Sequence, residues 1–160
     1  MTRKSHDQQC DRPERVAVFP GTFDPFTTGH LSIVTRGLQL FDRIVVAVGV
    51  NDVKHSGSSA EMRVDAIKRI FADEPRVTAV AYSGLTVEVA EAEGARFLLR
   101  GVRSVADFEY ERSLADINRN ISGVETVILY ALPELAVVSS SMVRELSRYG
   151  RDVTPYIPKN

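Results

Sequence analysis

The chain has 160 residues, which on a prior of roughly 100 to 200 residues per domain is enough for one domain. Hydrophobic residues make up 44% of it and charged residues 26%, so its composition is neither that of a disordered chain nor that of a collagen. The 20 basic and 21 acidic residues leave a net charge of −1, which gives no overall field to attract nucleic acid or an anionic membrane.

Several classes of protein are disfavoured by what the sequence lacks. The single cysteine, Cys10, excludes an internal disulfide and a cysteine-based zinc site and fits a reducing compartment. With only three histidines, we expect no protein metal site. There is no apolar run of membrane-spanning length. Residues 1–14 lack the apolar core of a secretory signal, and we expect a disordered extension there, followed by a single domain over residues 15–160.

From Arg15 onward, short apolar runs alternate with segments of helical period, which predicts βαβ units. In chain order, we expect a strand over 16–19, a helix over 31–41, a strand over 44–50, a helix over 58–71, a strand over 77–82, a helix over 86–94, a strand over 97–99, a helix over 106–121, a strand over 126–130 and a helix over 139–150. The spacing of Ser58 and Glu61 predicts a capping box. The pattern predicts an α/β fold, a Rossmann-like, doubly wound sheet of five parallel strands with helices on both faces, which binds ligands beyond the carboxyl ends of its strands.

The loop after the first strand has the composition of an anion-binding turn. Neither of the usual glycine-rich phosphate loops is present, which disfavours a dinucleotide-binding dehydrogenase and a P-loop NTPase. Instead, Gly21 would allow a ligand close to the backbone, and His30 stands at the start of a helix, where it could donate to a phosphate oxygen. Taken alone, His30 is better explained as a surface histidine behind a threonine cap, and it is the surrounding Gly-Thr-x-Asp-Pro motif that favours a ligand role.

Two later loops carry further donors for an anion. We place Arg100 and Arg103 immediately beyond the fourth strand, with Gly101 relaxing the backbone between them. Their guanidinium groups suit phosphate, although they could instead pair with the acidic side chains at 107, 109 and 111. Residues 139–141 are three serines at a helix start, and three exceed what a helix cap requires. Lys54 could reach the same crevice, or it could be a solvated loop lysine.

Together these loops predict a ligand with several phosphates. No Ser-His-Asp order, reactive cysteine or metal-ligand cluster is evident, which disfavours covalent catalysis. Positioning of phosphates and stabilisation of charge, as in nucleotidyl transfer, remains the favoured chemistry.

Three motifs resemble those of bacterial phosphopantetheine adenylyltransferases, in family order and spacing. They are Gly-Thr-Phe-Asp-Pro with Thr-Thr-Gly-His at 21–30, Arg-Gly-Val-Arg with Asp-Phe-Glu-Tyr-Glu at 100–111, and the serines at 139–141. The resemblance covers about residues 15–158, whereas the [HT]-x-G-H element alone would indicate only the wider nucleotidyltransferase superfamily. It implies transfer of AMP from ATP to 4′-phosphopantetheine, which gives dephospho-CoA and pyrophosphate in coenzyme A synthesis.

The resemblance also implies roles for individual residues. His30 matches the histidine that stabilises the transition state. The positions implied to bind phosphopantetheine are Thr22, Lys54, Thr86 and Arg100. Those implied to bind ATP are Thr22, Phe23, His30, Gly101, Val102, Arg103, Glu111, Leu135, Ala136, Val137, Val138, Ser139, Ser140 and Ser141. The resemblance further implies Mg²⁺ as cofactor, CoA as a further ligand, a cytoplasmic homohexamer, and neither nucleic acid nor membrane as partner.

Some residues depart from the family pattern. The loop at His55, Ser56 and Gly57 lacks a lysine that relatives often carry, and Leu135 stands where an aromatic residue is usual. Two other functions stay open: a nucleotidyltransferase that uses nicotinamide mononucleotide or glycerol 3-phosphate as acceptor, and a nucleotide-binding module without catalysis. Thr27 in place of the motif's first histidine favours the pantetheine branch.

Overall fold

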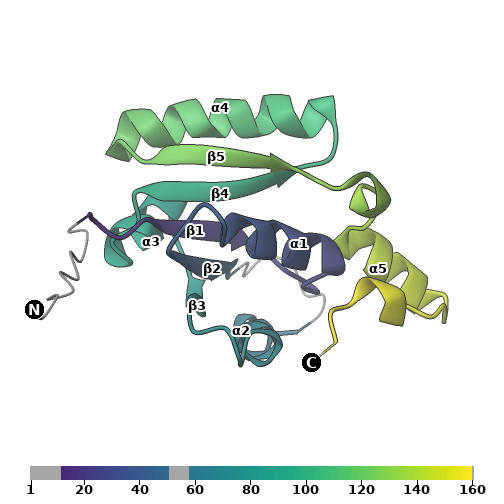
Figure 1. The fold of residues 1–160 in the computed structure, drawn as a ribbon. Coiled ribbons are helices and arrows are strands. Elements are labelled where there is room, and N and C mark those ends of the chain that lie inside the picture. The colour runs from purple at the N-terminus through teal and green to yellow at the C-terminus, as the bar shows by residue number, and fades with distance from the viewer. Residues whose placement is uncertain (1–11, 51–57, 160) are drawn as a thin grey trace, which may run out of the picture.

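Five parallel strands form one sheet in the computed structural model, which describes residues 12–50 and 58–159 (Figure 1). The strands are β1 (Val16–Gly21), β2 (Arg43–Gly49), β3 (Val77–Tyr82), β4 (Phe97–Val102) and β5 (Glu125–Tyr130), in the order β3-β2-β1-β4-β5. The helices are α1 (Thr28–Gly37), α2 (Ala60–Ile70), α3 (Thr86–Ala92), α4 (Val105–Ser122) and α5 (Ser140–Arg148), with short 3-10 helices at Pro133–Leu135 and Thr154–Tyr156. The predicted doubly wound sheet is confirmed; the two 3-10 helices were not predicted.

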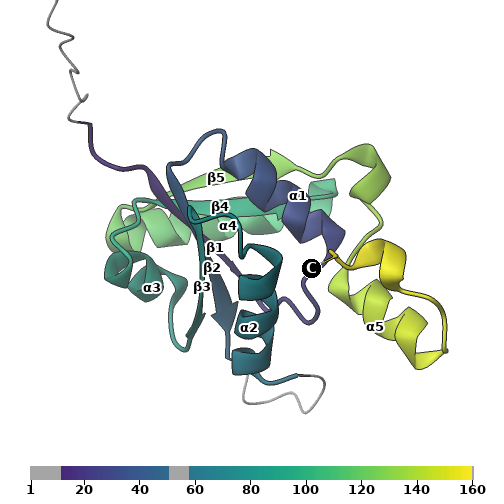
Figure 2. The ribbon, with the colours of Figure 1, turned by 60° about the horizontal axis from the view of Figure 1, so that its bottom comes forward.

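Each face of the sheet has its own apolar core, because side chains alternate along a strand. Ala17 and Phe19 of β1 point into a core shared with α1 and α2. Val16 and Val18 of the same strand point into a second core, which includes buried residues of α3. Figure 2 shows α1 and α2 together on one side of the sheet. Strands buried on both faces explain why β1 and β2 are almost continuously apolar.

A polar residue caps the start of four of the helices. Thr27, Ser59, Ser104 and Ser139 each accept a hydrogen bond from a backbone N–H of the first turn that follows, and this satisfies a group that has no partner within the helix. The predicted capping box at Ser58 is therefore wrong by one residue: Ser59 is the N-cap of α2 and accepts from the N–H of Met62 (3.2 Å).

Two strands run further than their apolar patterns indicate. β1 continues through Pro20 and Gly21, which pair with β2, and β4 continues through Val102. Arg100 and Gly101 thus lie inside β4, where they pair with Ile128 and Leu129, and the prediction that they follow the strand is wrong. Backbone pairing with β5 continues even though the side chains become polar.

The first helix is shorter than predicted. It ends at Gly37, so Leu38 and Phe41 contact the core from the following turn rather than from the helix. Gly37 has no room for a side chain, because a Cβ there would come within 2.7 Å of Leu99.

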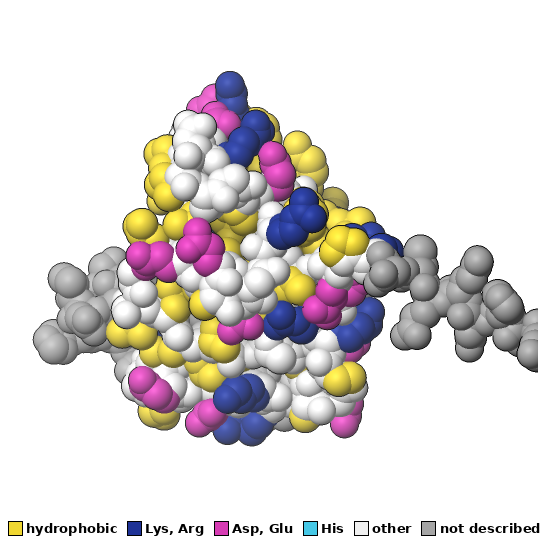
Figure 3. Space-filling model, turned by 90° about the vertical axis from the view of Figure 1, so that its left-hand side faces the viewer, with side chains coloured by type: hydrophobic (Ala, Val, Ile, Leu, Met, Phe, Trp, Pro, Cys, Tyr) yellow, Lys and Arg dark blue, Asp and Glu magenta, His cyan; other side chains and the backbone are white. Residues whose placement is uncertain are grey.

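The chain enters the sheet at the end opposite to α5 (Figure 1). Of the predicted extension, residues 1–11 lie outside the described part of the chain. Within the remainder, Arg12 forms an ion pair with Asp42 (2.8 Å), and the Glu14 carboxylate lies 3.8 Å from Arg43. Seen from this end, acidic and basic side chains are interspersed with hydrophobic ones (Figure 3).

The winding of the sheet reverses at β1. The chain first adds β2 and β3 on one side of β1 and then crosses over to add β4, which pairs directly with β1 on the other side. The carboxyl ends of these strands point toward α5 (Figure 1). Doubly wound sheets bind ligands at such a reversal, and the candidate site lies there. Among the described residues, no helix is long and apolar enough to cross a membrane.

Candidate active site

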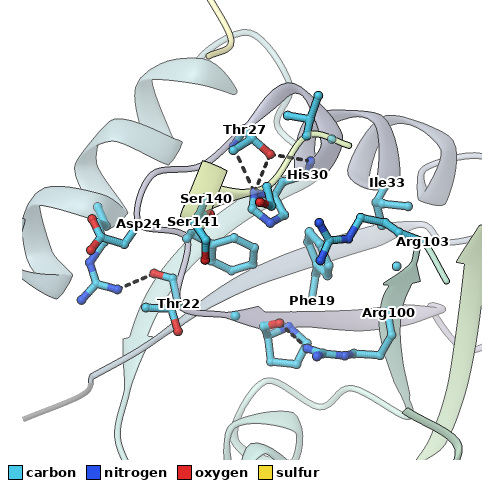
Figure 4. Close-up of a pocket in the computed structure, with 18 of the residues that line it drawn as sticks. Phe19, Thr22, Asp24, Thr27, His30, Ile33, Arg100, Arg103, Ser140 and Ser141 are labelled. Carbon is cyan, nitrogen blue, oxygen red and sulfur yellow. Dashed lines mark hydrogen bonds between the residues drawn. The ribbon is translucent and has the colours of Figure 1, made fainter. Parts of the chain in front are cut away.

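A cavity of about 1150 Å³ opens beyond the carboxyl ends of β1 and β4. The residues implied to bind ATP that line it are Thr22, Phe23, His30, Gly101, Arg103, Glu111, Leu135, Val138, Ser139, Ser140 and Ser141. Three segments far apart in the sequence therefore meet around one space, as predicted (Figure 4). Three residues implied to bind ATP do not line it: Val102 is 1% exposed and buried in the sheet, Ala136 lies outside the lining, and Val137 is 74% exposed. The ligand roles of all these residues stay predictions.

A second, smaller cavity of about 240 Å³ shares a wall with the first. Thr22 and Arg100 line both cavities, while Thr86 lines only the smaller one, beside Tyr82 and Asn118. Three of the four positions implied to bind phosphopantetheine thus lie around this second space. The fourth, Lys54, is outside the described residues, as is the unusual loop at 55–57.

His30 is fixed by the cap of its own helix. The backbone N–H of Thr27 donates to Nδ1 of His30 (3.0 Å), and the Thr27 hydroxyl lies 3.1 Å from the same nitrogen. A backbone N–H can only donate, so Nδ1 must carry its lone pair. We therefore assign the proton of the neutral ring to Nε2, which leaves an N–H donor on the nitrogen that the cap does not use.

The surroundings of His30 keep its ring neutral. Its centroid lies 5.0 Å from that of Phe23 and 5.3 Å from that of Phe26. Burial in this aromatic setting, and then the positive charges of Arg103 and Arg100, lower the pKa of His30 to about 4. At neutral pH the free protein therefore presents a hydrogen-bond donor, not a cation. Figure 4 shows His30 and the guanidinium of Arg103 pointing toward one another.

Arg100 is held by a buried carboxylate and a backbone carbonyl. Its Nε donates to Glu111 (2.8 Å), Nη2 donates to the other oxygen of the same carboxylate, and Nη1 donates to the carbonyl of Pro20. The Glu111 side chain is only 8% exposed. A guanidinium has five N–H donors, so two remain for a ligand. Arg100 can therefore pair with Glu111 and bind a ligand at the same time.

Arg103 is held more loosely. Its Nε lies 3.5 Å from Asp107, which also accepts from its backbone N–H (3.1 Å), and the Arg103 side chain is 43% exposed. Of the three acidic side chains considered as partners for the arginines, those at 107 and 111 pair with them. Gly101 between the arginines does not have the role we predicted, because its backbone is regular strand; a Cβ there would lie 3.0 Å from Ile33.

The loop after β1 turns sharply over its own glycine. Phe23 has a positive φ of 50°, which side chains rarely adopt, and its ring lies against Gly21, where a Cβ would meet it at 2.8 Å. Gly21 therefore makes room for Phe23, and the close approach of a ligand that we predicted is not needed to explain it.

Each serine of the triplet has a partner within the protein. Ser139 caps α5, Ser140 donates to the carbonyl of Pro25 (2.7 Å), and Ser141 accepts from Arg144 (3.3 Å). Only Ser139 serves the cap, so three serines do exceed what a cap requires, but the other two hydroxyls have partners within the protein. What the segment offers a ligand is the backbone N–H groups of Ser140 and Ser141 in the first turn of α5, since the N–H of Met142 donates to the Ser139 cap.

Arg63 of α2 is a lining residue that we did not predict. It is 9% exposed and donates to the carbonyls of Ser58, Ser59 and Thr22. The sequence carried a signal for it, because 60, 63, 64 and 67 form the buried stripe of α2, and a charged residue stands at one of those four core positions.

Comparisons with known proteins agree with the motifs. The cytidylyltransferase-like family matches residues 18–146. Phosphopantetheine adenylyltransferase of Phocaeicola vulgatus is 50% identical over 145 residues, which cover 91% of this chain and 96% of that protein. The enzyme of the same name from Porphyromonas gingivalis is 49% identical, covering 91% and 95%, and that from Leuconostoc citreum is 43% identical, covering 90% and 92%.

A solved structure supports the fold. The bifunctional NMN adenylyltransferase/ADP ribose pyrophosphatase of Francisella tularensis superposes with a TM-score of 0.72 at 15% identity, over 92% of this chain and 46% of that one. This chain thus spans less than half of that protein, and the likeness concerns the fold alone. The identity to the curated relatives over nine-tenths of its length shows that the chain belongs to the phosphopantetheine adenylyltransferase family of cytidylyltransferase-like proteins.

Proposed function

We propose that this protein transfers AMP from ATP to 4′-phosphopantetheine, which gives dephospho-CoA and pyrophosphate. The observation that carries the proposal is the meeting of three family motifs around one cavity, with a second cavity against the same wall. The names of the relatives, at 43 to 50% identity, supply the acceptor. The larger cavity would hold ATP and the smaller one the pantetheine arm, with Thr22 and Arg100 where the two ligands meet.

The proposed chemistry is a direct displacement. An oxygen of the acceptor's phosphate forms a bond to the α-phosphorus of ATP, and the bond from that phosphorus to the oxygen that bridges to the β-phosphorus breaks. Pyrophosphate leaves with the electron pair. Because the attacking phosphate is already an anion, no strong base is needed. The protein's task is to bring two anions together and stabilise the charge that builds up between them.

The donors around the cavity suit that task. The Nε2–H of His30 would donate to the α-phosphate, and the two remaining N–H groups of Arg100 would hold the acceptor's phosphate. Arg103 and the first turn of α5 would hold the outer phosphates of ATP, as helix N-termini do for anions. These hydrogen bonds gain strength when the ligands exclude water from the cavity.

Mg²⁺ would enter with the nucleotide. Among the described residues, no group of three or more His, Cys, Asp or Glu side chains is placed to hold a metal ion. Mg²⁺ commonly keeps several waters and binds through substrate phosphates and one or two carboxylates, so the residues present fit an ion carried by ATP. Asp24 lines the cavity and would supply a carboxylate. The ion would neutralise phosphate charge.

The surface of α4 supports assembly from several copies. Its only buried residue is Glu111. Four large apolar side chains of this helix are exposed by more than half: Val105, Tyr110, Ile117 and Ile121. Tyr110, Ile117 and Ile121 share one face of the helix at spacings of 7 and 4. Exposed apolar faces commonly mark interaction surfaces, and we propose that copies of the chain pack through α4 in a homohexamer. The proposed location is the cytoplasm, a reducing compartment that suits a chain with one cysteine.

The proposal is tested by incubating the purified protein with ATP, Mg²⁺ and 4′-phosphopantetheine and measuring pyrophosphate and dephospho-CoA. Parallel reactions contain nicotinamide mononucleotide or glycerol 3-phosphate instead, and a His30→Asn variant serves as the control for contaminating enzymes. We expect turnover in the reaction with phosphopantetheine and none with either of the other two acceptors. Turnover only with another acceptor would refute the substrate, and ATP binding without any turnover would favour a non-catalytic module.

A further inference from the structure

Three arginines from three different elements hold alternate carbonyls of residues 20–24, which include the end of β1 and the start of the loop after it. Arg100 of β4 donates to Pro20, Arg63 of α2 donates to Thr22, and Arg144 of α5 donates to Asp24, each through Nη1. Residues 20–24 are thus tied to the neighbouring strand β4 and to two separate helices. Of the three, Arg63 is the most buried and has no role in the proposed binding of either substrate.

The partners of Arg63 are an unusual set for a buried charge. Its Nε lies 3.2 Å from the carbonyl of Ser58 and 3.3 Å from that of Ser59, and Nη1 donates to Thr22. Within residues 12–50 and 58–159, no carboxylate lies within ion-pair distance of it. Burial of a charge is costly unless it is paired, and well-packed apolar residues often replace buried ions without loss. The fold alone therefore gives little reason for an arginine at this position of α2.

We propose that Arg63 is a positioning residue for AMP transfer, which holds Thr22 at the junction of the two cavities. Thr22 lines both cavities, so its backbone position sets the wall where the acceptor's phosphate and the α-phosphate of ATP would meet. The same guanidinium binds the carbonyls at the start of α2, and it thereby couples that helix to the loop after β1. The inference rests on the proposed function.

The expected consequence is a loss of rate rather than of binding. Transfer needs the two reacting atoms about 3 to 3.5 Å apart and aligned, and a displacement of about 1 Å can cost about 100-fold. ATP binding is spread over many donors. We therefore expect removal of the guanidinium to lower kcat by about 10- to 100-fold, while the ATP dissociation constant changes by less than about threefold.

The test uses Arg63→Met, which fills similar space on the buried stripe without donors, and Arg63→Lys, which keeps the charge. Arg69→Met is the matched control, since Arg69 is exposed in the last turn of the same helix. For each full-length variant, kcat, both KM values, the ATP dissociation constant and Tm are measured. We expect Arg63→Met to keep its Tm within a few degrees while kcat falls, Arg63→Lys to recover part of kcat, and Arg69→Met to match the parent protein.

Two results would overturn the inference. One is an Arg63→Met variant whose kcat stays within twofold of the parent. The other is a fall of Tm, kcat and ATP affinity in parallel in both Arg63 variants, which would assign the residue to the stability of the fold. If the parent protein itself does not transfer AMP to phosphopantetheine, the proposed function fails first, and the inference falls with it. Measuring the parent protein first separates that failure from a failure of the inference alone.

Discussion

The neutral state of His30 predicts how folding stability depends on pH. In the folded protein its pKa is about 4, below the ordinary 6.5 that applies when the chain unfolds. Between these two values the unfolded chain binds a proton that the folded protein does not, so stability falls as the pH falls from about 6.5 to 4 and the loss levels off below. Each pKa unit corresponds to about 1.36 kcal/mol. The loss attributable to His30 is therefore at most about 3 kcal/mol.

The comparison variant is His30→Asn, whose side-chain oxygen can still accept from the N–H of Thr27 but does not titrate. Unfolding free energies are measured by urea denaturation at several pH values between 7 and 4. Carboxylates that titrate in this range are common to both proteins, so the difference between the two curves isolates His30. The wild-type curve should fall more steeply, by up to about 1.36 kcal/mol per pH unit. Parallel curves, or an NMR titration of His30 near 6.5, would refute the assignment of a neutral ring.

Three further predictions concern catalysis, packing and assembly. His30→Asn should lower kcat by about 10²- to 10³-fold with little change in ATP affinity, as for loss of a transition-state donor, and equal losses in both would contradict its role. Gly101→Ala places a Cβ 3.0 Å from Ile33 and should cost about 1–3 kcal/mol in urea denaturation; Ile33→Ala in the same chain should make the combined loss less than additive. Ile117→Glu on the exposed face of α4 should shift the oligomer toward smaller species in analytical ultracentrifugation, and an unchanged distribution would argue against that interface.

The fold was largely predictable because local patterns and packing agree. Alternation of apolar strands and amphipathic helices indicated all five strands in the right order along the chain. The ends of elements were less predictable, as Arg100 shows: a polar side chain marks the end of an apolar run, whereas backbone pairing with β5 sets the end of the strand. At Ser58 and Ser59, either of two neighbouring serines could cap α2, and the structure shows that the second one does.

The site was predictable to the level of its motifs but not of its contacts. The motifs indicated which loops meet, and His30, Arg103 and the serines at 139–141 do line one cavity. Local sequence could not show that the Ser140 hydroxyl donates to the carbonyl of Pro25, because that hydrogen bond joins residues 115 positions apart. For Arg63, the pattern of α2 indicated burial but not the partners. Its acceptors are backbone carbonyls, and the sequence does not show which carbonyl a side chain will contact.

The arrangement of charged side chains around the cavity, rather than its net charge, explains how a protein of net charge −1 can suit a polyphosphate. The charged residues among the described lining are Arg63, Arg100, Arg103, Arg144, Asp24, Glu61, Asp107 and Glu111, which sum to zero. Attraction therefore depends on where the charges lie. Glu111 and Asp107 lie on α4 and pair with Arg100 and Arg103. Arg63 instead donates to backbone carbonyls, which are neutral and do not offset its positive charge. Because donors are fixed by other parts of the fold before a ligand arrives, little reorganisation is needed at the moment of transfer, and this preorganisation is the usual source of electrostatic catalysis.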